Sequence, residues 1–390
     1  MKSSGMVIFF GVFFLVYGLI NTYIILHAWQ AIPVGSALRA PLLVLAIMLA
    51  LSFIAGRVME RLWPSSISTG LIWVGSLWLG AMLYFFLAVV VFDLVRLVNH
   101  FLPFFPEAMT QAYGVWKFRV ALVTVGAVVL LLGAGYLNAR TPRVRELTFP
   151  VAKTMEGGQS MTIVAASDIH LGTIIGRERL RSLVDQINSL APDVVLLPGD
   201  IVDEDLAPVV RENLGETLRE IRARYGVFAI TGNHEYIGGA EAACRYLAEH
   251  GIIMLRDSLA HLPNGVVIAG REDLSGRQFG GVQRKPLKEL LAGIDTSHPV
   301  ILLDHQPFHL AEGAENGVDV QLSGHTHDGQ LWPLNYITRA VYEVSWGYLR
   351  KGGTHIYVSC GVGTWGPPVR LGNRPEILHI TLRSQGDVQR

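Results

Sequence analysis

The segment DVVLLPGD, residues 193–200, is a short apolar run that ends in a proline, a glycine and a carboxylate. Four other segments between residues 162 and 327 have the same arrangement, an apolar run followed directly by Asp, His or Asn. Their polar motifs are Asp168-Ile169-His170, Gly232-Asn233-His234-Glu235, Asp304-His305-Gln306-Pro307 and Gly324-His325-Thr326-His327. We expect five strands whose ends deliver these side chains to one edge of a sheet.

Helical periodicity separates these apolar runs. Leu180, Leu183, Val184 and Ile187 fall on one helix face, and further helices are expected at residues 209–224 and 241–249. Strands that alternate with helices are typical of an α/β domain with largely parallel pairing. Two later runs, residues 355–359 and 377–382, have no helix between them and suggest a second, mixed sheet.

The residue types in these motifs are those of a two-metal site. Asp168 and His170 are two residues apart on an expected extended segment and so share a direction, as do His325 and His327. Two such pairs can face one ion. Asp200 follows a glycine, which suits a carboxylate that bridges two ions ~3.5–4 Å apart. Asn233 adds an amide oxygen and His305 an imidazole, and this sulfur-free set favours Mn, Fe or Zn.

Each motif alone is weak, because Asp and Gly are common in turns and a single His is more often structural than a ligand. The ordered set carries more weight. Its seven donors each stand at a predicted strand end, which favours a common metal site.

The five motifs, in this order, resemble the signature of the calcineurin-like metallophosphoesterase superfamily over about residues 162–332. The resemblance implies a four-layer αββα sandwich with two divalent metal ions. It implies that one ion is bound by Asp168, His170, Asp200 and His327. Asp200 would also bridge to the second ion, which Asn233, His305 and His325 complete.

The resemblance also implies a mechanism, in which a metal-activated water attacks phosphorus in line. His234 would stabilise the transition state or protonate the leaving oxygen, and Glu235 would fix its imidazole through a hydrogen bond. The alternative for Glu235 is a helix-cap or surface carboxylate. Asp304, next to His305, is expected to be structural.

Residues 352–372 resemble a membrane-associated subgroup that includes transmembrane proteins with a metallophosphoesterase domain. In this reading Arg370 meets a substrate anion and Trp365 walls the pocket, whereas a structural Arg and a core Trp are the alternative. The expected function is hydrolysis of phosphodiester or pyrophosphate bonds. A lipid-linked substrate, such as a phospholipid or a UDP-diacylglucosamine-like molecule, is compatible with a membrane anchor.

Half of the 390 residues are hydrophobic, and the apolar excess lies before Gly135. Four segments without charge, residues 5–29, 40–56, 70–92 and 120–136, predict membrane-spanning helices within a transmembrane region at residues 1–137. A signal peptide is the alternative for the first, and buried soluble helices for the others. Residues 138–150 are then expected to be a juxtamembrane linker entering an edge strand, and residues 151–390 the catalytic domain.

With four spans, both chain ends lie on one side of the cell membrane. The basic residues on that side slightly outnumber those on the other, which favours a cytoplasmic catalytic domain by the positive-inside rule. Asp93 and Arg96, at the end of the third span, are expected to anchor it at the interface rather than to line a transport path.

The formal net charge is zero and no basic stripe is present, so nothing indicates a nucleic-acid partner. The two cysteines, Cys244 and Cys360, do not make a thiolate metal site. The alternative function is a transporter or membrane signalling protein with a regulatory, metal-binding phosphoesterase-like domain. A transporter predicts polar residues deep within the spans, where Asn21 is the main candidate. The sequence contains no indication of oligomeric state.

Overall fold

The computed structural model describes residues 3–384, and the chain divides into two compact units. The helical unit comprises residues 1–137 and 366–369, and the sandwich unit comprises residues 138–365 and 370–390.

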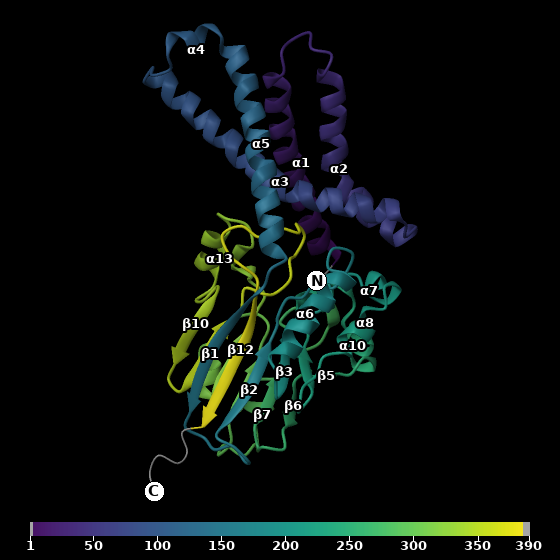
Figure 1. Cartoon of the computed structure of the whole chain (residues 1–390), viewed down its shortest axis with the longest axis vertical. Coiled ribbons are helices and arrows are strands. Elements are labelled where there is room, and N and C mark those ends of the chain that lie inside the picture. The colour runs from purple at the N-terminus through teal and green to yellow at the C-terminus, as the bar shows by residue number, and fades with distance from the viewer. Residues whose placement is uncertain (1–2, 385–390) are drawn as a thin grey trace. The chain divides into compact units, whose positions relative to one another are not determined.

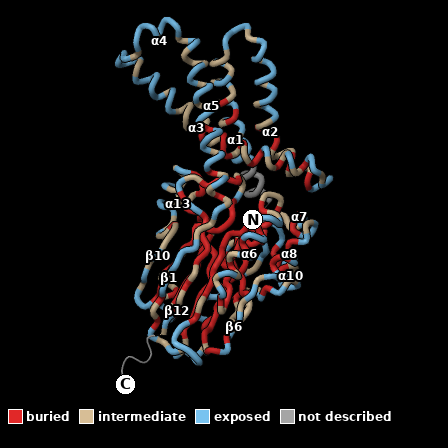
Figure 2. Tube along the Cα trace, in the orientation of Figure 1, coloured by how far each residue is buried: buried red, intermediate tan, exposed pale blue. Residues whose placement is uncertain are grey.

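Five helices build the helical unit (Figure 1). They are α1 (Ser3–Ala31), α2 (Arg39–Leu62), α3 (Ser66–Phe101), α4 (Glu107–Gln111) and α5 (Tyr113–Ala139). All except α4 are long and apolar enough to cross a membrane, and each contains one of the four apolar segments noted above. Few of the side chains on these helices are buried, and most are exposed or partly exposed, as Figure 2 shows, which suits surfaces that face hydrocarbon.

Helices α2 and α3 pack closely because glycine lies at their contact. A Cβ added at Gly75 would lie 2.3 Å from the Phe53 backbone nitrogen, and one at Gly56 would lie 2.7 Å from that of Ile72. Small residues let helix backbones approach each other in a membrane. Asn21 is buried among these helices, where it accepts a hydrogen bond from Trp78 Nε1 (2.9 Å) and donates one to the Tyr17 carbonyl (2.9 Å). Its polar atoms therefore stabilise helix packing, which gives no support to a transport path.

The sandwich unit contains two six-stranded sheets. The first has, in spatial order, β1 (Arg143–Val151), β12 (Glu376–Ser384), β2 (Ser160–Ala165), β3 (Val194–Pro198), β4 (Val227–Ile230) and β5 (Ile252–Met254). Strands β2 to β5 are parallel, whereas β12 runs antiparallel to β2 and parallel to β1. Most of the expected linker thus belongs to the edge strand β1.

The second sheet is mixed, as expected. In spatial order it has β10 (Gly347–Lys351), β11 (Thr354–Val358), β9 (Val320–Ser323), β8 (Val300–Leu303), β7 (Val267–Gly270) and β6 (Ser258–His261). Its two outer strands are antiparallel to their neighbours and the inner four are parallel. Our prediction for residues 377–382, which we expected in this sheet, is wrong: the run belongs to β12 in the first sheet. Both faces of that sheet are covered, and Ile377 and Leu378 are buried on opposite sides of it.

Alternating side chains hold the layers together. Val194 and Leu196 of β3 pack between the two sheets, whereas Val195 and Leu197 pack under the helices on the outer face. Those helices are α6 (Arg177–Ser189), α7 (Ala207–Arg211), α8 (Leu214–Leu218) and α10 (Ala240–Glu249). On the outer face of the second sheet, α11 (Leu287–Leu290) closes a further core. The predicted four-layer αββα sandwich is confirmed, and Figure 2 shows its buried strands in red.

The remaining elements are short. They are α9 (Asn233–Gly238), η1 (Gly276–Gly280), α12 (Ala311–Glu315), η2 (His327–Gly329) and α13 (Asn335–Val341). The single helix expected at residues 209–224 is instead the pair α7 and α8. Asn213 separates them with a φ of 51°, a left-handed conformation that asparagine tolerates better than most residues.

Candidate metal centre

Five loops meet where the two sheets end. Strands β2, β3 and β4 of the first sheet and β8 and β9 of the second each lead directly into one of the sequence motifs. These strands are parallel within each sheet, so their carboxyl ends lie on the same edge. The motifs therefore converge, although they are contributed by two sheets and not by one as expected.

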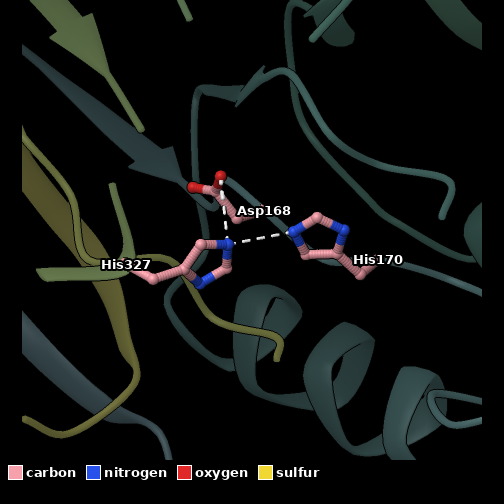
Figure 3. A group of neighbouring side chains, drawn as sticks. All are labelled: Asp168, His170 and His327. Carbon is pink, nitrogen blue, oxygen red and sulfur yellow. Dashed lines mark hydrogen bonds and ion pairs between the residues drawn. The ribbon is translucent and has the colours of Figure 1, made fainter. Parts of the chain in front are cut away.

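The first group of donors is Asp168, His170 and His327 (Figure 3). His327 Nε2 lies 3.0 Å from His170 Nε2 and 3.7 Å from Asp168 Oδ1, and all three residues are buried. Two imidazoles and a carboxylate thus direct nitrogen and oxygen atoms at one point, an arrangement suited to a divalent cation.

The second group is Asp200, His305 and His325, beside Asn233. His305 Nε2 lies 3.1 Å from Asp200 Oδ2 and 3.2 Å from Asn233 Oδ1. His325 Nδ1 lies 2.7 Å from the same Asn233 oxygen. Asp200 Oδ2 is also 3.9 Å from His170 Nε2 of the first group, so this carboxylate lies between the two groups.

The backbone that presents these donors is left-handed at five positions. The φ angles are 55° at Asp168, 54° at His170, 51° at Asp200, 74° at His325 and 49° at His327. Asp168 and His170, like His325 and His327, are therefore not on extended segments, so our prediction that the members of each pair share a direction for that reason is wrong. His325 and His327 in fact belong to different groups, because the left-handed turn directs their side chains apart.

Hydrogen bonds offset the cost of this backbone, which is about 1–2 kcal/mol per non-glycine residue. Asp168 Oδ1 accepts from the His325 N–H (2.8 Å), and Asp200 Oδ1 accepts from the His234 N–H (2.9 Å). The His170 N–H donates to the Asp200 carbonyl (3.0 Å). In Asp200, Oδ1 thus holds a neighbouring loop while Oδ2 faces His305 and His170, whereas in Asp168 the loop-holding Oδ1 is also the oxygen near His327.

Glycines make this close approach of the loops feasible. A Cβ at Gly232 would lie 2.1 Å from Asp200 Oδ1, and one at Gly324 would lie 2.3 Å from Asp168 Oδ2. At Gly199, φ is 85° and a Cβ would lie 2.6 Å from His305 Nδ1. The glycines that precede Asp200, Asn233 and His325 are therefore required by contact with a donor from another loop.

Burial and neighbouring charges shift the acidities of the donors. Burial raises the pKa of Asp168. It also opposes the charge on Asp200, but His305 and His234 outweigh it and hold the pKa of that carboxyl well below its usual range. Burial lowers the pKa of His325 to about 4 and that of His327 well below its usual value.

In the first group, an oxygen atom left unpaired by the described part of the chain indicates that these residues suit a metal ion. Asp168 Oδ2 is buried and has no hydrogen-bond partner among the described residues. An unpaired buried carboxylate oxygen is costly, and a cation would satisfy it. The seven donors are oxygen and nitrogen atoms only, which suits divalent Mn, Fe or Zn.

His234 lies beside the first group, and its partner is a residue that sequence reasoning missed. Its Nδ1 is 3.1 Å from Asp203 Oδ1, and its ring centroid is 4.6 Å from that of His170. Burial alone would lower the pKa of His234, but Asp200 and Asp203 raise it to about 9. The position of Asp203 three residues after Asp200, in the same loop, was the available signal.

Glu235 does not hold the imidazole of His234; it is the helix-cap carboxylate that was the alternative, at the start of α9. Its carboxylate accepts hydrogen bonds from the backbone N–H groups of Gly232 (2.7 Å), Val202 (2.8 Å) and Asp200 (3.1 Å). Burial raises its pKa. It has this position because α9 begins at Asn233 and directs Glu235 back under the loop after β3. Glu235 therefore joins the two loops that present Asp200 and Asn233.

Arg370 is fully buried, which contradicts the expected contact with a substrate anion. It donates to the Gly363 carbonyl and to Asn373 Oδ1 (3.1 Å), and its Nη2 lies 3.1 Å from His327 Nδ1. Its guanidinium thus supports His327 and the adjoining loop. Asp304 pairs with Arg284 and Arg271, a structural role that agrees with expectation.

Trp365 is at the rim of the site. Its side chain is 54% exposed, and its ring centroid lies 5.9 Å from that of His234. The backbone of Trp365 is bonded in both directions to the side chain of Gln330 (2.9 Å each). It is therefore not a core residue, and its exposed ring lies where it can contact a ligand.

Comparisons with known proteins agree with this geometry. The model of the family described as calcineurin-like phosphoesterase matches residues 161–329. An uncharacterized metallophosphoesterase of Aquifex aeolicus is 34% identical over 67% of this chain and 99% of its own length. Two relatives named transmembrane protein with metallophosphoesterase domain, from Danio rerio and Bos taurus, are 32% and 33% identical over 70% and 68% of this chain. The chain spans only 65% and 62% of those two proteins.

A solved structure, a 5'-nucleotidase precursor from Thermus thermophilus, covers 57% of this chain and 55% of its own. Its TM-score is 0.35 at 16% identity, which supports no conclusion about function.

Proposed function

The chain belongs to the calcineurin-like phosphoesterase family and is a metal-dependent phosphoesterase, and we propose that it hydrolyses phosphodiester or pyrophosphate bonds at a two-metal site. The observation that carries the proposal is the position of Asp200. Its carboxylate is 3.1 Å from His305 of one donor group and 3.9 Å from His170 of the other. A carboxylate shared between two sets of donors is the arrangement that a pair of neighbouring cations needs.

We assign Asp168, His170 and His327 to one cation and Asn233, His305 and His325 to the other, with Asp200 between them. Two divalent cations at these positions, with Mn our first choice and Fe or Zn the alternatives, would activate a water nucleophile and neutralise charge on the phosphoryl oxygens.

His234 is the residue that we propose to protonate the leaving oxygen. Its ring lies next to that of His170, and Asp203 Oδ1 lies 3.1 Å from its Nδ1. The Asp203 carboxylate beside Nδ1 favours a proton on that nitrogen, which leaves Nε2 for the substrate. Asp203 thus acts as a positioning residue, the part first expected of Glu235. Trp365, exposed beside His234, is proposed to contact the group that leaves.

We further propose that residues 1–137 form a multi-pass region in the cell membrane and residues 151–390 the catalytic domain. Support comes from the four apolar helices and from the names of the fish and bovine relatives. The basic residues favour a cytoplasmic catalytic domain. A lipid-linked phosphate ester as substrate rests on analogy with the membrane anchor.

The test is Mn-dependent hydrolysis by the full-length protein of phosphomonoesters, phosphodiesters and lipid-linked pyrophosphates. Wild type is expected to prefer diesters or pyrophosphates. Asp200→Ala is expected to lose bound metal and to reduce turnover by about 10³-fold or more, whereas His234→Ala should retain the metal and lose about 10²–10⁴-fold. Asp185→Ala, an exposed carboxylate on α6, is the matched control.

Two results would contradict the proposal. One is full turnover by Asp200→Ala, which would show that hydrolysis does not need the shared carboxylate. The other is a wild-type protein that binds two metals and cleaves only monoesters. That result would support the metal site and contradict the proposed substrate class.

A further inference from the structure

Helix α5 does not pack tightly against the other long helices of the helical unit. It diverges from α3 toward α4 (Figure 1), and a cavity of ≈ 570 Å³ lies between α5 and the helices α1, α2 and α3. This volume falls within the range of ~300–1,000 Å³ that is typical of small-molecule sites. The cavity, which we call the α5 cavity, is far from any residue of the metal centre in the sequence and belongs to the helical unit alone.

The wall of the α5 cavity is almost entirely apolar. All four long helices contribute, with residues such as Ile24, Leu49, Phe85, Val125 and Leu132. Water does not fill a space lined by such side chains, because it would find no hydrogen-bond partners there. An empty space would forfeit dispersion contacts along its whole lining. Hydrocarbon is therefore the material that fits this interior.

One end of the cavity is polar. His27 near the end of α1, Asp93 and Arg96 late in α3, and Lys117 early in α5 all line it. Asp93 is held by several donors: Tyr23 OH at 2.6 Å, His27 Nε2 at 3.1 Å and Arg96 Nη1 at 3.1 Å. The carboxylate at this rim is thus already satisfied by the protein.

Lys117 has no comparable partner. Its ammonium lies 5.4 Å from the centroid of the Tyr113 ring, and no carboxylate of residues 3–384 pairs with it. The polar end therefore combines a neutralised carboxylate, Asp93, with the ammonium of Lys117, unpaired within the described chain, which lines the apolar α5 cavity. A ligand that matches both parts has a hydrocarbon tail and an anionic head.

We propose that the α5 cavity binds an anionic phospholipid, with an acyl chain among the apolar side chains and its phosphate at Lys117. This site goes beyond the proposed hydrolysis and does not depend on it. A single ammonium beside the headgroup is expected to favour an anionic over a zwitterionic lipid by about fivefold.

The experiment uses the full-length protein in detergent, equilibrated with equal amounts of phosphatidylglycerol and phosphatidylcholine of the same chain length. Native mass spectrometry then counts the lipids that stay bound. Wild type is expected to retain one lipid and to prefer phosphatidylglycerol about fivefold. Lys117→Gln should retain a lipid with no preference, and Lys117→Arg should restore the preference.

A pair of substitutions on α5 tests the chamber itself. Val125 lines the cavity, whereas Val123 does not and is 72% exposed. Val125→Trp should narrow the cavity and reduce lipid retention, and Val123→Trp should retain lipid as wild type does. Circular dichroism checks that both variants remain helical.

Equal retention of the two lipids by wild type would overturn the proposal, as would equal losses in the two tryptophan variants. A wild-type protein that retains no lipid and whose copies cross-link through α5 would assign the cavity to a second copy of the chain. Because Lys117→Gln changes only a rim residue, the headgroup assignment stays testable even if Val125→Trp fails to fold.

Discussion

The helical unit and the sandwich unit differ in how they satisfy the hydrogen bonds of their backbone N–H and carbonyl groups. Between residues 3 and 137, Gly35 is the one described residue with a positive φ, whereas the described part of the sandwich unit has eleven such non-glycine residues. Hydrocarbon offers no partners to a backbone N–H or carbonyl, so the helical unit relies on regular helices. The sandwich unit can use irregular loops because side-chain carboxylates satisfy them. Strain is therefore concentrated where chemistry is expected.

The largest effect is expected when one methyl group is added to a loop of the metal centre, which tests whether these irregular loops tolerate displacement. Gly232→Ala places a Cβ 2.1 Å from Asp200 Oδ1, so the loop or the carboxylate must move. A shift of this size at a reacting centre costs about 10²-fold or more in rate. We expect turnover to fall by at least that factor and metal content to drop, as measured by kinetics and elemental analysis. Unchanged activity would mean that these loops tolerate displacement.

A second prediction separates the side chains of the site from its backbone. Asp203→Asn keeps the shape but removes the charge beside His234, and we expect about a 10- to 100-fold loss of turnover with metal retained. In the double variant with His234→Ala, Asp203→Asn should add no further loss, because the two residues act together. Additive losses in that cycle would show that Asp203 acts independently of His234.

In the helical unit, Gly75 is also in close contact with backbone atoms, as the glycines of the metal centre are with its donors. Gly75→Ala puts a Cβ 2.3 Å from the Phe53 backbone nitrogen, where α2 and α3 meet. Overpacking of this kind costs about 1–3 kcal/mol. We expect the free energy of unfolding in detergent to fall by that amount, followed by circular dichroism, while turnover of the folded protein is unchanged. A neutral result would mean that the two helices separate easily.

The smallest effect is expected at Gly133 on α5. A Cβ there meets nothing within 4 Å, and alanine favours the helix over glycine by about 1 kcal/mol. Gly133→Ala should therefore match or slightly exceed the stability of wild type in the same unfolding assay. A clear destabilisation would reveal a partner that packs on this face of α5.

Much of this architecture could be predicted from local patterns. Val194 to Leu197 is apolar without interruption, which identifies a strand covered on both faces, and the uncharged runs identify the long helices. The placement of β12 could not be predicted, because its pairing with β1 and β2 joins residues more than 200 positions apart. No local pattern encodes that choice between two sheets.

In the site, the sequence indicated which residue types gather but not how they are oriented. The left-handed turn at His325 and His327 sends neighbouring histidines to different groups, which alternation along a strand cannot predict. The sequence also did not predict which side chains are buried. Arg370 was expected to contact an anion, but it is fully buried and contacts Gly363 and His327. Asp203 was missed because only the folded loop brings it to His234.

The carboxylate of Glu235 has a consequence for the order of events during biogenesis. It ties the loops after β3 and β4 through three N–H groups that need no ion. Many small metal sites fold only when the metal arrives, so their assembly depends on its supply. Here the loops that carry Asp200 and Asn233 are held before loading, so folding can precede metal uptake. A chelator should then yield a folded, inactive chain that regains activity when metal is returned, without passing through an unfolded state.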